Sequence, residues 1–377
     1  MSKIFAIPLK FLATQPGIVF IRRKSNSILS KVRITPCIGL PVFWRQELKS
    51  LRVLTQSPLG SPRDLGERPH KLEENRKILL SGASGMVGSA LRQALVKNHH
   101  TLLQLVRRPP ATPAEIQWNP AADPAIPNPE LLENISAAIH LSGSNVAAHR
   151  WTADFKREIA ESRIQSTHAL ARVLAQLRNP PQTLLVASAT GIYGNRHDQL
   201  LDEFSSPGSG FLANLCQDWE AAAQPAVQSG IRVVHLRFGV VIGAGPGALA
   251  KMLPIFRLGL GGPLGSGRQC MSWISLQDAI AAILFLLATP SIDGPVNLTA
   301  PSPITNRLFT RALAHAVHRP AILPAPAFAL RLALGEMADE ALLASARAYP
   351  SKLTSAGFQF THPTIAQAID SALGSAA

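Results

Sequence analysis

The sequence predicts an α/β fold in which helices cover both faces of a doubly wound parallel β-sheet. Short runs that are apolar throughout alternate with helical patterns of about ten or more residues, which is typical of parallel strands joined by crossover helices. A glycine-rich turn joins the first run to the first helix. After about residue 300 the alternation stops and proline-interrupted helical patterns follow. We therefore predict a basic, disordered N-terminal extension (1–76), a main α/β domain (77–300) and a small, mainly helical C-terminal domain (301–377).

Each predicted element can be placed on the sequence. Strands are short and rich in Val, Ile and Leu, whereas helices show apolar residues at a spacing of three or four. Ser275 and Asp278 form the pattern Ser-x-x-Asp before an apolar helix, which predicts a capping box. The predicted strands are 77–82, 101–106, 137–143, 183–189 and 232–242, and the predicted helices are 86–97, 151–177, 308–318, 328–337 and 339–349, with a short extended piece at 357–360.

The composition excludes several classes of protein. With 377 residues and a hydrophobic fraction of 46%, the chain can bury a sizeable core. Its longest apolar run, 279–288, is much shorter than the roughly 20 residues that span a bilayer. Cys37, Cys216 and Cys270 are widely separated, so we predict no metal site and no disulfide framework. We expect a soluble protein of a reducing compartment, the cytoplasm.

The net charge of +14 is concentrated in the N-terminal extension. Residues 1–76 contain 14 Lys and Arg against 5 Asp and Glu, and no acidic residue precedes Glu47. This composition is typical of a transit segment, which would place the protein in the mitochondrial matrix. An arm that touches nucleic acid or anionic lipid, an unstructured extension and a start codon placed too far upstream are alternatives. Because the chain lacks a basic stripe with interleaved aromatic residues, we expect no nucleic-acid partner and no membrane partner.

The turn after the first strand has the spacing of a dinucleotide-binding loop. In "SGASGMVG", one glycine turns the chain, a second lets the backbone approach a pyrophosphate, and a third lets the helix pack on the strand. Backbone N–H groups at the helix N-terminus then bind the phosphates. The alternative is a tight turn without a ligand. The residues predicted to bind the dinucleotide here are Gly82, Ser84, Gly85, Met86, Val87 and Gly88.

The end of the second strand indicates which dinucleotide binds. An acidic residue there would bind the ribose 2′-hydroxyl of NAD, whereas an arginine accommodates the 2′-phosphate of NADP. The chain has Arg107 and Arg108 at this place, in "LVRRPP". We predict NADP as the cofactor, with NAD as the less favoured choice. The alternative is a pair of solvated loop arginines.

From Lys77 onward the chain resembles the extended short-chain dehydrogenase/reductase superfamily. Within it, the chain is most similar to the epimerase-like subgroup (nucleoside-diphosphate-sugar epimerases, the NAD-dependent epimerase/dehydratase family) that ends in a small domain of its own. The stretches that carry the resemblance are "LLSGASGMVGSAL", "AAIHLSGSNVAAHRWTADFKREIAESRIQST", "SATGIYGNR", "FLANLCQDWEAAA", "LRFGVVIG", "RLGLGGPLGSGRQCMSWISLQD" and "LGEMADEALLASARAYPSKLTSAGFQF". The resemblance implies a Rossmann-type sheet and a nicotinamide cofactor.

The resemblance also implies site residues that spacing alone does not indicate. The glycine-rich stretch 259–267, with Trp273, would border the substrate pocket. From the residues alone, Glu158 and Arg163 would be a surface pair and Arg237 an arginine at a strand end. The cofactor-lining residues that the resemblance implies are Leu141, Ser142 and Gly143 beside the nicotinamide ribose, Glu158 and Arg163 on one helix face, and Arg237.

The catalytic tyrosine of the superfamily is missing. The resemblance implies that Ser188, in "SATGIYGNR", is the catalytic serine and that Tyr193 is a neighbouring pocket tyrosine. Leu212 and Cys216 occupy approximately the positions of the catalytic tyrosine and of the lysine four residues after it. Carbonyl reduction needs a proton donor, and a leucine cannot supply one. The usual acid is therefore absent.

Tyr193 is the remaining candidate acid. Arg196 and His197 could lower its pKa or relay a proton, and the alternative is a tyrosine that packs at a strand end. Asp202 and Glu203 are expected to be solvated loop carboxylates, and His140 a hydrogen-bonded core histidine.

Two functions follow from these residues. The first is an NADP-dependent oxidoreductase or epimerase-like enzyme that acts on a small carbonyl or sugar-nucleotide by hydride transfer, with Ser188 and Tyr193 as catalytic residues. The second is a catalytically weak or inactive NADP(H)-binding protein that acts as a cofactor or redox sensor. Both predict a small-molecule partner, and neither predicts the oligomeric state.

Overall fold

The structure is a computed structural model in which residues 75–374 are described. The predictions made for residues 1–74 and 375–377 lie outside the described residues, and the predicted N-terminal extension therefore stays a prediction. No helix in the described part of the chain is both long enough and apolar enough to cross a membrane.

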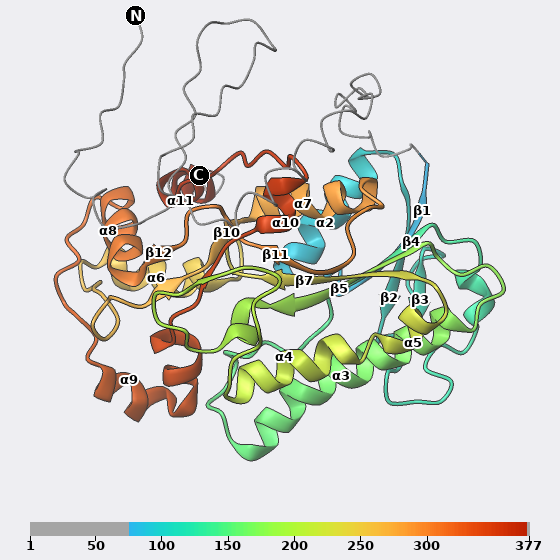
Figure 1. The fold of residues 1–377 in the computed structure, drawn as a ribbon, viewed down its shortest axis with the longest axis horizontal. Helices are drawn as coiled ribbons and strands as arrows, with labels where there is room; N and C mark the ends of the chain where they lie inside the picture. Colours follow the sequence, from blue (N-terminus) through green and yellow to red (C-terminus); the bar gives the residue numbers. More distant parts are fainter. Residues whose placement is uncertain (1–74, 375–377) are drawn as a thin grey trace, which may run out of the picture. The chain divides into compact units, whose positions relative to one another are not determined.

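Seven parallel strands form the central sheet in the order β11-β7-β5-β4-β1-β2-β3 (Figure 1). The chain builds outward from β1 in one direction and then returns to build outward in the other. The carboxyl ends of β1 and β4 flank the point of reversal, where open α/β sheets bind their ligands. The strands are β1 (Lys77–Ser81), β2 (Thr101–Val106), β3 (Glu115–Gln117), β4 (Ala137–His140), β5 (Thr183–Ala189), β7 (Arg232–Phe238) and β11 (Gly294–Leu298).

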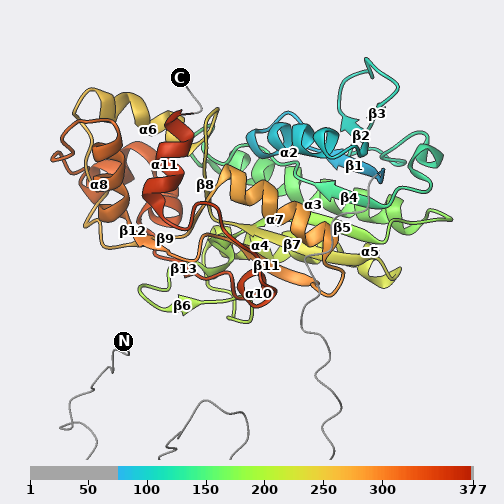
Figure 2. The ribbon, with the colours of Figure 1, turned by 90° about the horizontal axis from the view of Figure 1, so that it is seen from above.

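Helices cover both faces of the sheet, so the predicted doubly wound α/β fold is confirmed (Figures 1 and 2). Successive strand residues point to opposite faces. Ile78 and Leu80 of β1 belong to a core cluster with α2 and α7, whereas Leu79 belongs to a second cluster with α3 and α5. The helices are α2 (Met86–Lys97), α3 (Ala153–Ala175), α4 (Phe211–Ala221), α5 (Gln224–Gln228) and α7 (Leu276–Ala288), with a 3₁₀ turn η2 at Pro129–Leu132.

The strand predicted at 232–242 is broken, so that prediction is wrong in its second half. β7 ends at Phe238, and β8 (Val240–Ile242) leaves the main sheet to pair with β10 (Trp273–Ser275). Gly239 stands at the break, where a Cβ atom would lie 2.7 Å from the carbonyl oxygen of Ser272. The sequence stays apolar after the break because Ile242 of β8 is buried in another core cluster.

The residues after 300 complete two hydrophobic clusters. One cluster joins α6 (Ala248–Arg257) to α8 (Asn306–Ala316) and α11 (Ile365–Gly374). The other is the core cluster of β1, to which Leu353 of α10 (Ser351–Ser355) and Phe358 contribute beside Val296 of β11. The domain boundary at residue 300 stays a prediction.

The helix predicted at 339–349 is wrong beyond its first turn. A π-helical turn, η4 (Ala338–Leu343), follows α9 (Ala327–Leu334), and the chain then forms β13 (Arg347–Ala348). β13 pairs with β6 (Leu200–Leu201). The two strands lie far apart in the sequence, so no local pattern could indicate this pairing. Residues 358–360 belong to no helix and to no strand, so the predicted extended piece pairs with no sheet. The remaining short pair is β9 (Cys270–Met271) with β12 (Ile304–Thr305).

Candidate functional site

The three glycines of the first turn have different roles. Gly82 has a φ of 74°, and a Cβ atom there would lie 2.7 Å from the carbonyl carbon of Leu141. A Cβ atom at Gly88 would lie 2.1 Å from the carbonyl oxygen of Gly82. At Gly85 the distance to that oxygen would be 3.5 Å, which is an ordinary contact. The fold therefore requires glycine at 82 and 88, whereas at 85 the protein itself leaves room for a side chain.

The N-terminus of α2 lies at the strand switch point and has no cap. Its N-cap residue, Gly85, makes no side-chain hydrogen bond, and no acidic residue stands in the first turn. Thr152, Ser275 and Thr305 cap α3, α7 and α8 through their hydroxyl groups. The cap predicted at Ser275 is confirmed, but the carboxylate of Asp278 accepts from the backbone N–H groups of Thr361 and His362, so the reciprocal half of the capping box is not formed. The first N–H groups of a helix have no partner within the helix. The N–H groups of α2 are thus suited to an anion such as a phosphate.

A buried hydrogen-bonded group lies directly below this turn. The ring of His140 is held by Ser81 Oγ at 2.5 Å from Nδ1 and by Ser166 Oγ at 3.1 Å from Nε2. Ser142 Oγ donates to Ser81 Oγ at 3.2 Å. Burial lowers the pKa of His140 to about 4, so the ring is neutral at pH 7. His140 is therefore the core histidine that the sequence predicts, and it ties the strand end of residues 141–143 to β1.

Only one of the two arginines after β2 is unengaged. Arg108 binds Glu115 through two hydrogen bonds of 2.6 and 2.8 Å and donates to the carbonyl oxygen of Pro109. The side chain of Arg107 is exposed, and within the described residues it makes no hydrogen bond or ion pair. If one of these arginines accommodates a 2′-phosphate, it is Arg107.

Glu158 and Arg163 do not lie on one face of α3. Glu158 is exposed, whereas the side chain of Arg163 turns toward the end of β4. Arg163 donates to the carbonyl oxygen of Ser144 at 2.9 Å, and its guanidinium carbon lies 5.1 Å from the ring centre of Trp219. A Cβ atom at Gly143 would lie 3.2 Å from the same guanidinium carbon. Of the two residues, Arg163 is the one whose side chain lies at the end of β4, beside the strand switch point.

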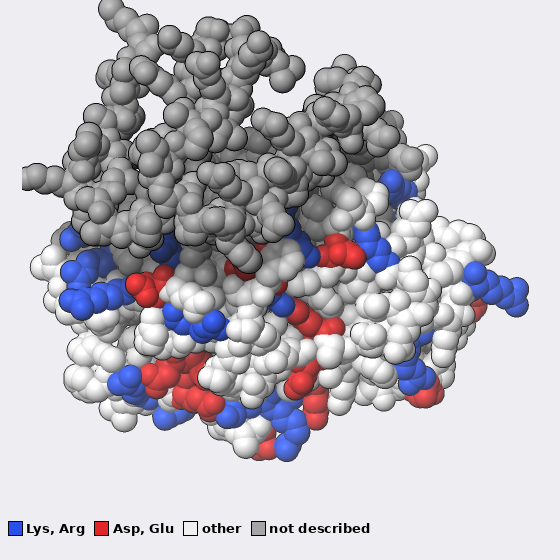
Figure 3. Space-filling view, viewed as in Figure 1, with Lys and Arg blue, Asp and Glu red and all other residues white. Residues whose placement is uncertain are grey.

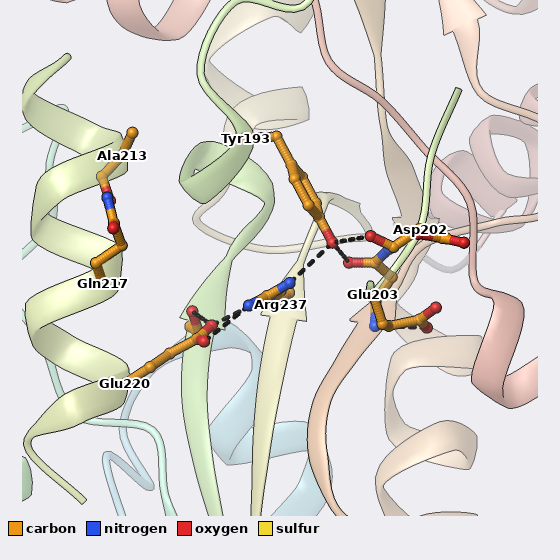
Figure 4. A network of polar contacts seen from close by, with 9 residues as sticks. Tyr193, Asp202, Glu203, Ala213, Gln217, Glu220 and Arg237 are labelled. Atoms are coloured by element: carbon orange, nitrogen blue, oxygen red, sulfur yellow. Dashed lines mark hydrogen bonds and ion pairs between the residues drawn. The ribbon is translucent and has the colours of Figure 1, made fainter. Parts of the chain in front are cut away.

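Ser188, Glu220 and Arg237 form one buried polar group at the carboxyl ends of β5 and β7. Figure 4 shows Glu220 and Arg237 of this group. Arg237 binds both carboxylate oxygens of Glu220, at 2.8 and 2.9 Å, and Ser188 Oγ donates to Glu220 Oε1 at 2.7 Å. Burial alone would raise the pKa of Glu220, but the hydrogen bonds and charge of Arg237 hold it below its usual value. Because an ionised carboxylate only accepts, Ser188 donates its hydrogen to Glu220.

Tyr193, at the end of the 3₁₀ turn η3 (Thr190–Tyr193), continues this group and is 0% exposed. Its hydroxyl lies 2.9 Å from the carbonyl oxygen of Asp202 and 2.8 Å from Asn297 Oδ1, and it accepts from Arg237 at 3.0 Å. Burial raises the pKa of Tyr193 despite the nearby charge of Arg237. Arg196 instead bonds Gln199 and the carbonyl oxygen of Ser206. The catalytic role of Tyr193 stays a prediction.

In the superfamily, one face of α4 would carry the catalytic tyrosine and lysine. Here the first two residues of that face, Leu212 and Cys216, are apolar. A Cβ atom at Gly191 would lie 3.4 Å from Leu212 Cβ and 3.9 Å from Cys216 Sγ, so both side chains face η3. Burial raises the pKa of the Cys216 thiol to about 12. Glu220 is one turn further along the same face. Sequence reasoning missed Glu220, although its spacing of four from Cys216 was a usable signal.

The prediction of solvated carboxylates is wrong for Glu203. Glu203 is 4% exposed, and its Oε1 accepts from the backbone N–H groups of Asn297 and Lys352 at 3.1 and 3.3 Å. Burial raises its pKa, and Oε2 is buried without a partner among the described residues. The loop folds inward here because β6 pairs with β13. Asp202 remains partly exposed and forms a turn with Phe204 and Ser205.

A hollow of about 450 Å³ lies beside this region. Gly265 and Ser266 of the glycine-rich stretch line it, as the resemblance implies, but Trp273 does not. Trp273 is 0% exposed and donates its indole N–H to the carbonyl oxygen of Ser302. His197, which the sequence analysis named beside Tyr193, also lines it. The other lining residues, which sequence reasoning missed, are Asn195, Asp198, Arg268, Gln269, Ala327, Arg331, Leu343 and Ser345.

Comparison with known proteins agrees with this geometry. Residues 78–298 match the model of the NAD dependent epimerase/dehydratase family, and residues 325–372 match a domain of unknown function (DUF1731). The chain is 48% identical over 295 residues to the epimerase family protein Mb2239 of Mycobacterium bovis, with 78% of this chain and 97% of that protein covered. It is 35% identical over 298 residues to the epimerase family protein SDR39U1 of Bos taurus, with 78% and 98% covered.

A solved structure agrees as well. The crystal structure of human epimerase family protein SDR39U1 (isoform 2) with NADPH matches with a TM-score of 0.72 at 32% identity, covering 79% of this chain and 99% of that chain. The match with the family model covers more than half of the chain, and the relatives are covered almost completely. The chain therefore belongs to the NAD-dependent epimerase/dehydratase family.

Proposed function

We propose that the protein is an NADP(H)-dependent oxidoreductase that transfers hydride to or from a small carbonyl or sugar-nucleotide substrate. The observation that carries this proposal is the strand switch point between the ends of β1 and β4, where open α/β sheets bind ligands in a crevice. There the N-terminus of α2, which no side chain caps, follows a glycine turn. A Cβ atom at residue 82 or 88 of this turn would clash with the backbone. Such a turn at a strand switch point fits a pyrophosphate.

The residues of the crevice fit NADP(H) better than NAD(H). Arg107 is exposed at the end of β2, where the ribose 2′-phosphate of NADP would be bound, and no described residue forms a hydrogen bond or ion pair with its side chain. No described acidic side chain is free at this strand end, because Glu115 is occupied by Arg108. The human SDR39U1 structure, which contains NADPH, supports the same choice. When bound, the nicotinamide supplies the hydride donor or acceptor.

The proton that accompanies hydride transfer needs a separate donor or acceptor. Ser188 donates to Glu220, so it offers a substrate an acceptor oxygen and no hydrogen. Tyr193 has no exposed surface, and its hydroxyl is already shared among three partners. Ser188 and Tyr193 thus hold the strand ends in place in this structure. The hollow lined by Arg268 and Arg331 is the proposed place for the rest of the substrate.

A second candidate function is an NADP(H)-binding protein with little or no turnover. The hydroxyl groups of Ser188 and Tyr193, the two predicted catalytic residues, are both hydrogen-bonded within one buried polar group. This observation favours the second candidate. Both candidates require the same cofactor and differ only in turnover. The proposed compartment is the cytoplasm, with the mitochondrial matrix as the alternative if residues 1–76 are a transit segment.

Cofactor choice is tested by two matched variants. We expect Arg107→Ala to weaken NADPH binding about ten- to hundredfold, because one charge-assisted contact is lost, and to leave NADH binding unchanged. Arg108→Ala is the control, since Arg108 is already occupied by Glu115. Dissociation constants from isothermal titration calorimetry give the result. Equal losses for NADPH and NADH in Arg107→Ala would contradict the choice of NADP(H), and no binding of either would remove the proposal.

Turnover separates the two candidate functions. The protein saturated with NADPH is offered aldehydes, ketones and nucleotide-sugars, and oxidation of the cofactor is followed by absorbance. Oxidation with any of these substrates supports the oxidoreductase, and a loss in Tyr193→Phe but not in Cys216→Ala would identify Tyr193 as the acid. Tight binding without oxidation across the series supports the binding protein.

A further inference from the structure

The structure contains buried or half-buried guanidinium groups near the sheet at Arg163, Arg232 and Arg237. Different groups of the protein offset the positive charge of each arginine. Arg232 donates to carbonyl oxygens at the C-terminal end of α7, where the helix dipole offsets its charge. Arg237 binds the carboxylate of Glu220. Arg163 donates to the carbonyl oxygens of Ile159 and Ser144, and no carboxylate of the described residues forms an ion pair with it.

The charge of Arg163 lies at the end of β4. Its guanidinium carbon would be 3.2 Å from a Cβ atom at Gly143 and stacks over Trp219 of α4. Arg107 follows β2, on the other side of the switch point. The two arginines therefore lie at opposite halves of the crevice, one by the strand end that binds the adenosine ribose and the other by the strand end beyond the phosphates.

The groups around Arg163 do not cancel its charge. The Cys216 thiol is neutral because burial raises its pKa to about 12. The carboxylate of Glu220 is already neutralised by Arg237. Glu158 points to the outside of α3, where it is exposed. This half of the crevice keeps a positive charge that the described part of the protein does not compensate, and burial makes such a charge costly.

We propose that Arg163 makes the site prefer the reduced dinucleotide, NADPH, over NADP⁺. This inference rests on the proposed function and on the family resemblance, which implies that the nicotinamide ribose lies beside residues 141–143, directly after β4. The two forms share their phosphates, but the oxidised ring carries one positive charge and the reduced ring is neutral. An uncompensated guanidinium nearby therefore disfavours only the oxidised form. A protein of this kind holds NADPH and releases NADP⁺, which suits both a reductase and a sensor of the reduced pool.

The test compares the affinities of NADPH and NADP⁺ for the full-length protein and three variants. Arg163→Met removes the charge but keeps an unbranched side chain over Trp219, and Arg163→Lys keeps the charge. Arg157→Met, on the exposed side of α3, is the matched control. We expect the wild type, Arg163→Lys and Arg157→Met to bind NADPH about tenfold more tightly than NADP⁺. In Arg163→Met that ratio should fall to near one, mainly because NADP⁺ binds more tightly.

Three results separate the possible roles of Arg163. A loss of affinity by the same factor for NADPH and NADP⁺ in Arg163→Met would mean that Arg163 binds a phosphate, and the inference would be wrong. If both affinities in Arg163→Met equal those of the wild type, Arg163 only packs on Trp219, and the inference would again be wrong. If the wild type binds neither form, the proposed function itself fails. Circular dichroism and thermal melting establish that each variant is folded.

Discussion

Two regions at the carboxyl ends of the strands differ in how their charges are paired, although each contains an arginine. At the ends of β5 and β7, Arg237 binds Glu220, and the buried group extends to Tyr193 and Asn297. At the ends of β1 and β4, backbone N–H groups and Arg163 have no acidic partner among the described residues. The guanidinium of the first region is paired with a carboxylate of the protein, whereas that of the second has no acidic partner among the described residues.

This difference tells which changes affect stability and which affect binding. A buried pair that loses one partner leaves an uncompensated charge, so changes at the ends of β5 and β7 should lower the free energy of unfolding. At the ends of β1 and β4 the charge has no acidic partner even without a ligand, so changes there should act mainly on the affinity for the cofactor. On the face seen in Figure 3, acidic and basic side chains of the described residues are interspersed. We therefore attribute the difference to these local groups, and the predictions below test it.

The largest effect is expected for Glu220→Ala. Removing the carboxylate leaves the guanidinium of Arg237 buried, at a side-chain exposure of 7%, without a counter-charge. We expect a loss of about 3–5 kcal/mol in the free energy of unfolding, measured by urea denaturation. Glu161→Ala, an exposed glutamate on α3, is the control. A loss below about 1 kcal/mol would show that the group around Glu220 is not what holds this region together.

The second effect is a dependence of stability on pH that comes from His140. Its pKa is about 4 in the folded protein, below the ordinary 6.5, so the unfolded chain binds more protons between these values. The free energy of unfolding should therefore decrease as the pH falls from 6.5 to 4, by up to about 3 kcal/mol from this residue. His140→Gln should flatten that part of the profile, whereas exposed His168→Gln should not. Identical profiles for wild type and His140→Gln would contradict the prediction.

The smallest effect on stability is expected for Gly85→Ala. A Cβ atom there meets only an ordinary contact, and the φ of −73° suits alanine, so stability should change by less than about 1 kcal/mol. NADPH binding should nevertheless weaken at least tenfold, to order of magnitude, because the methyl group blocks the approach of the pyrophosphate. Gly88→Ala is the contrast, since its Cβ would clash with the Gly82 carbonyl and destabilise the fold. Unchanged affinity in Gly85→Ala would place the phosphates elsewhere.

The sequence was sufficient for five of the seven strands of the sheet, for the glycine turn and for His140, but it missed the two edge strands β3 and β11. Buried parallel strands are apolar throughout, and a glycine between a strand and a helix has few alternative uses, so local patterns carry this information. His140 could be assigned to the core because it stands inside such a run. The family and its cofactor class followed from the order of the motifs, which the comparisons confirm.

The sequence was insufficient where a residue depends on a distant partner. Glu203 and Glu220 are both acidic residues in ordinary polar surroundings along the chain, yet one is buried by β11 and α10 and the other by Arg237 of β7. The predicted helix at 339–349 and the predicted strand at 232–242 failed for the same reason. In each, a short pairing with a remote strand overrides the local pattern.

The insertion of Leu353 and Phe358 into the cluster that contains Ile78 links the first strand of the sheet to a segment close to the C-terminal helix α11 in the sequence. During synthesis, the seven strands emerge from the ribosome well before these two side chains do. Until then the edge strand β11 lacks part of its cover, and a nascent chain would be a good client for chaperones. A premature stop codon before residue 353 should accordingly give a product that proteases degrade quickly, even though every strand of the sheet has been made.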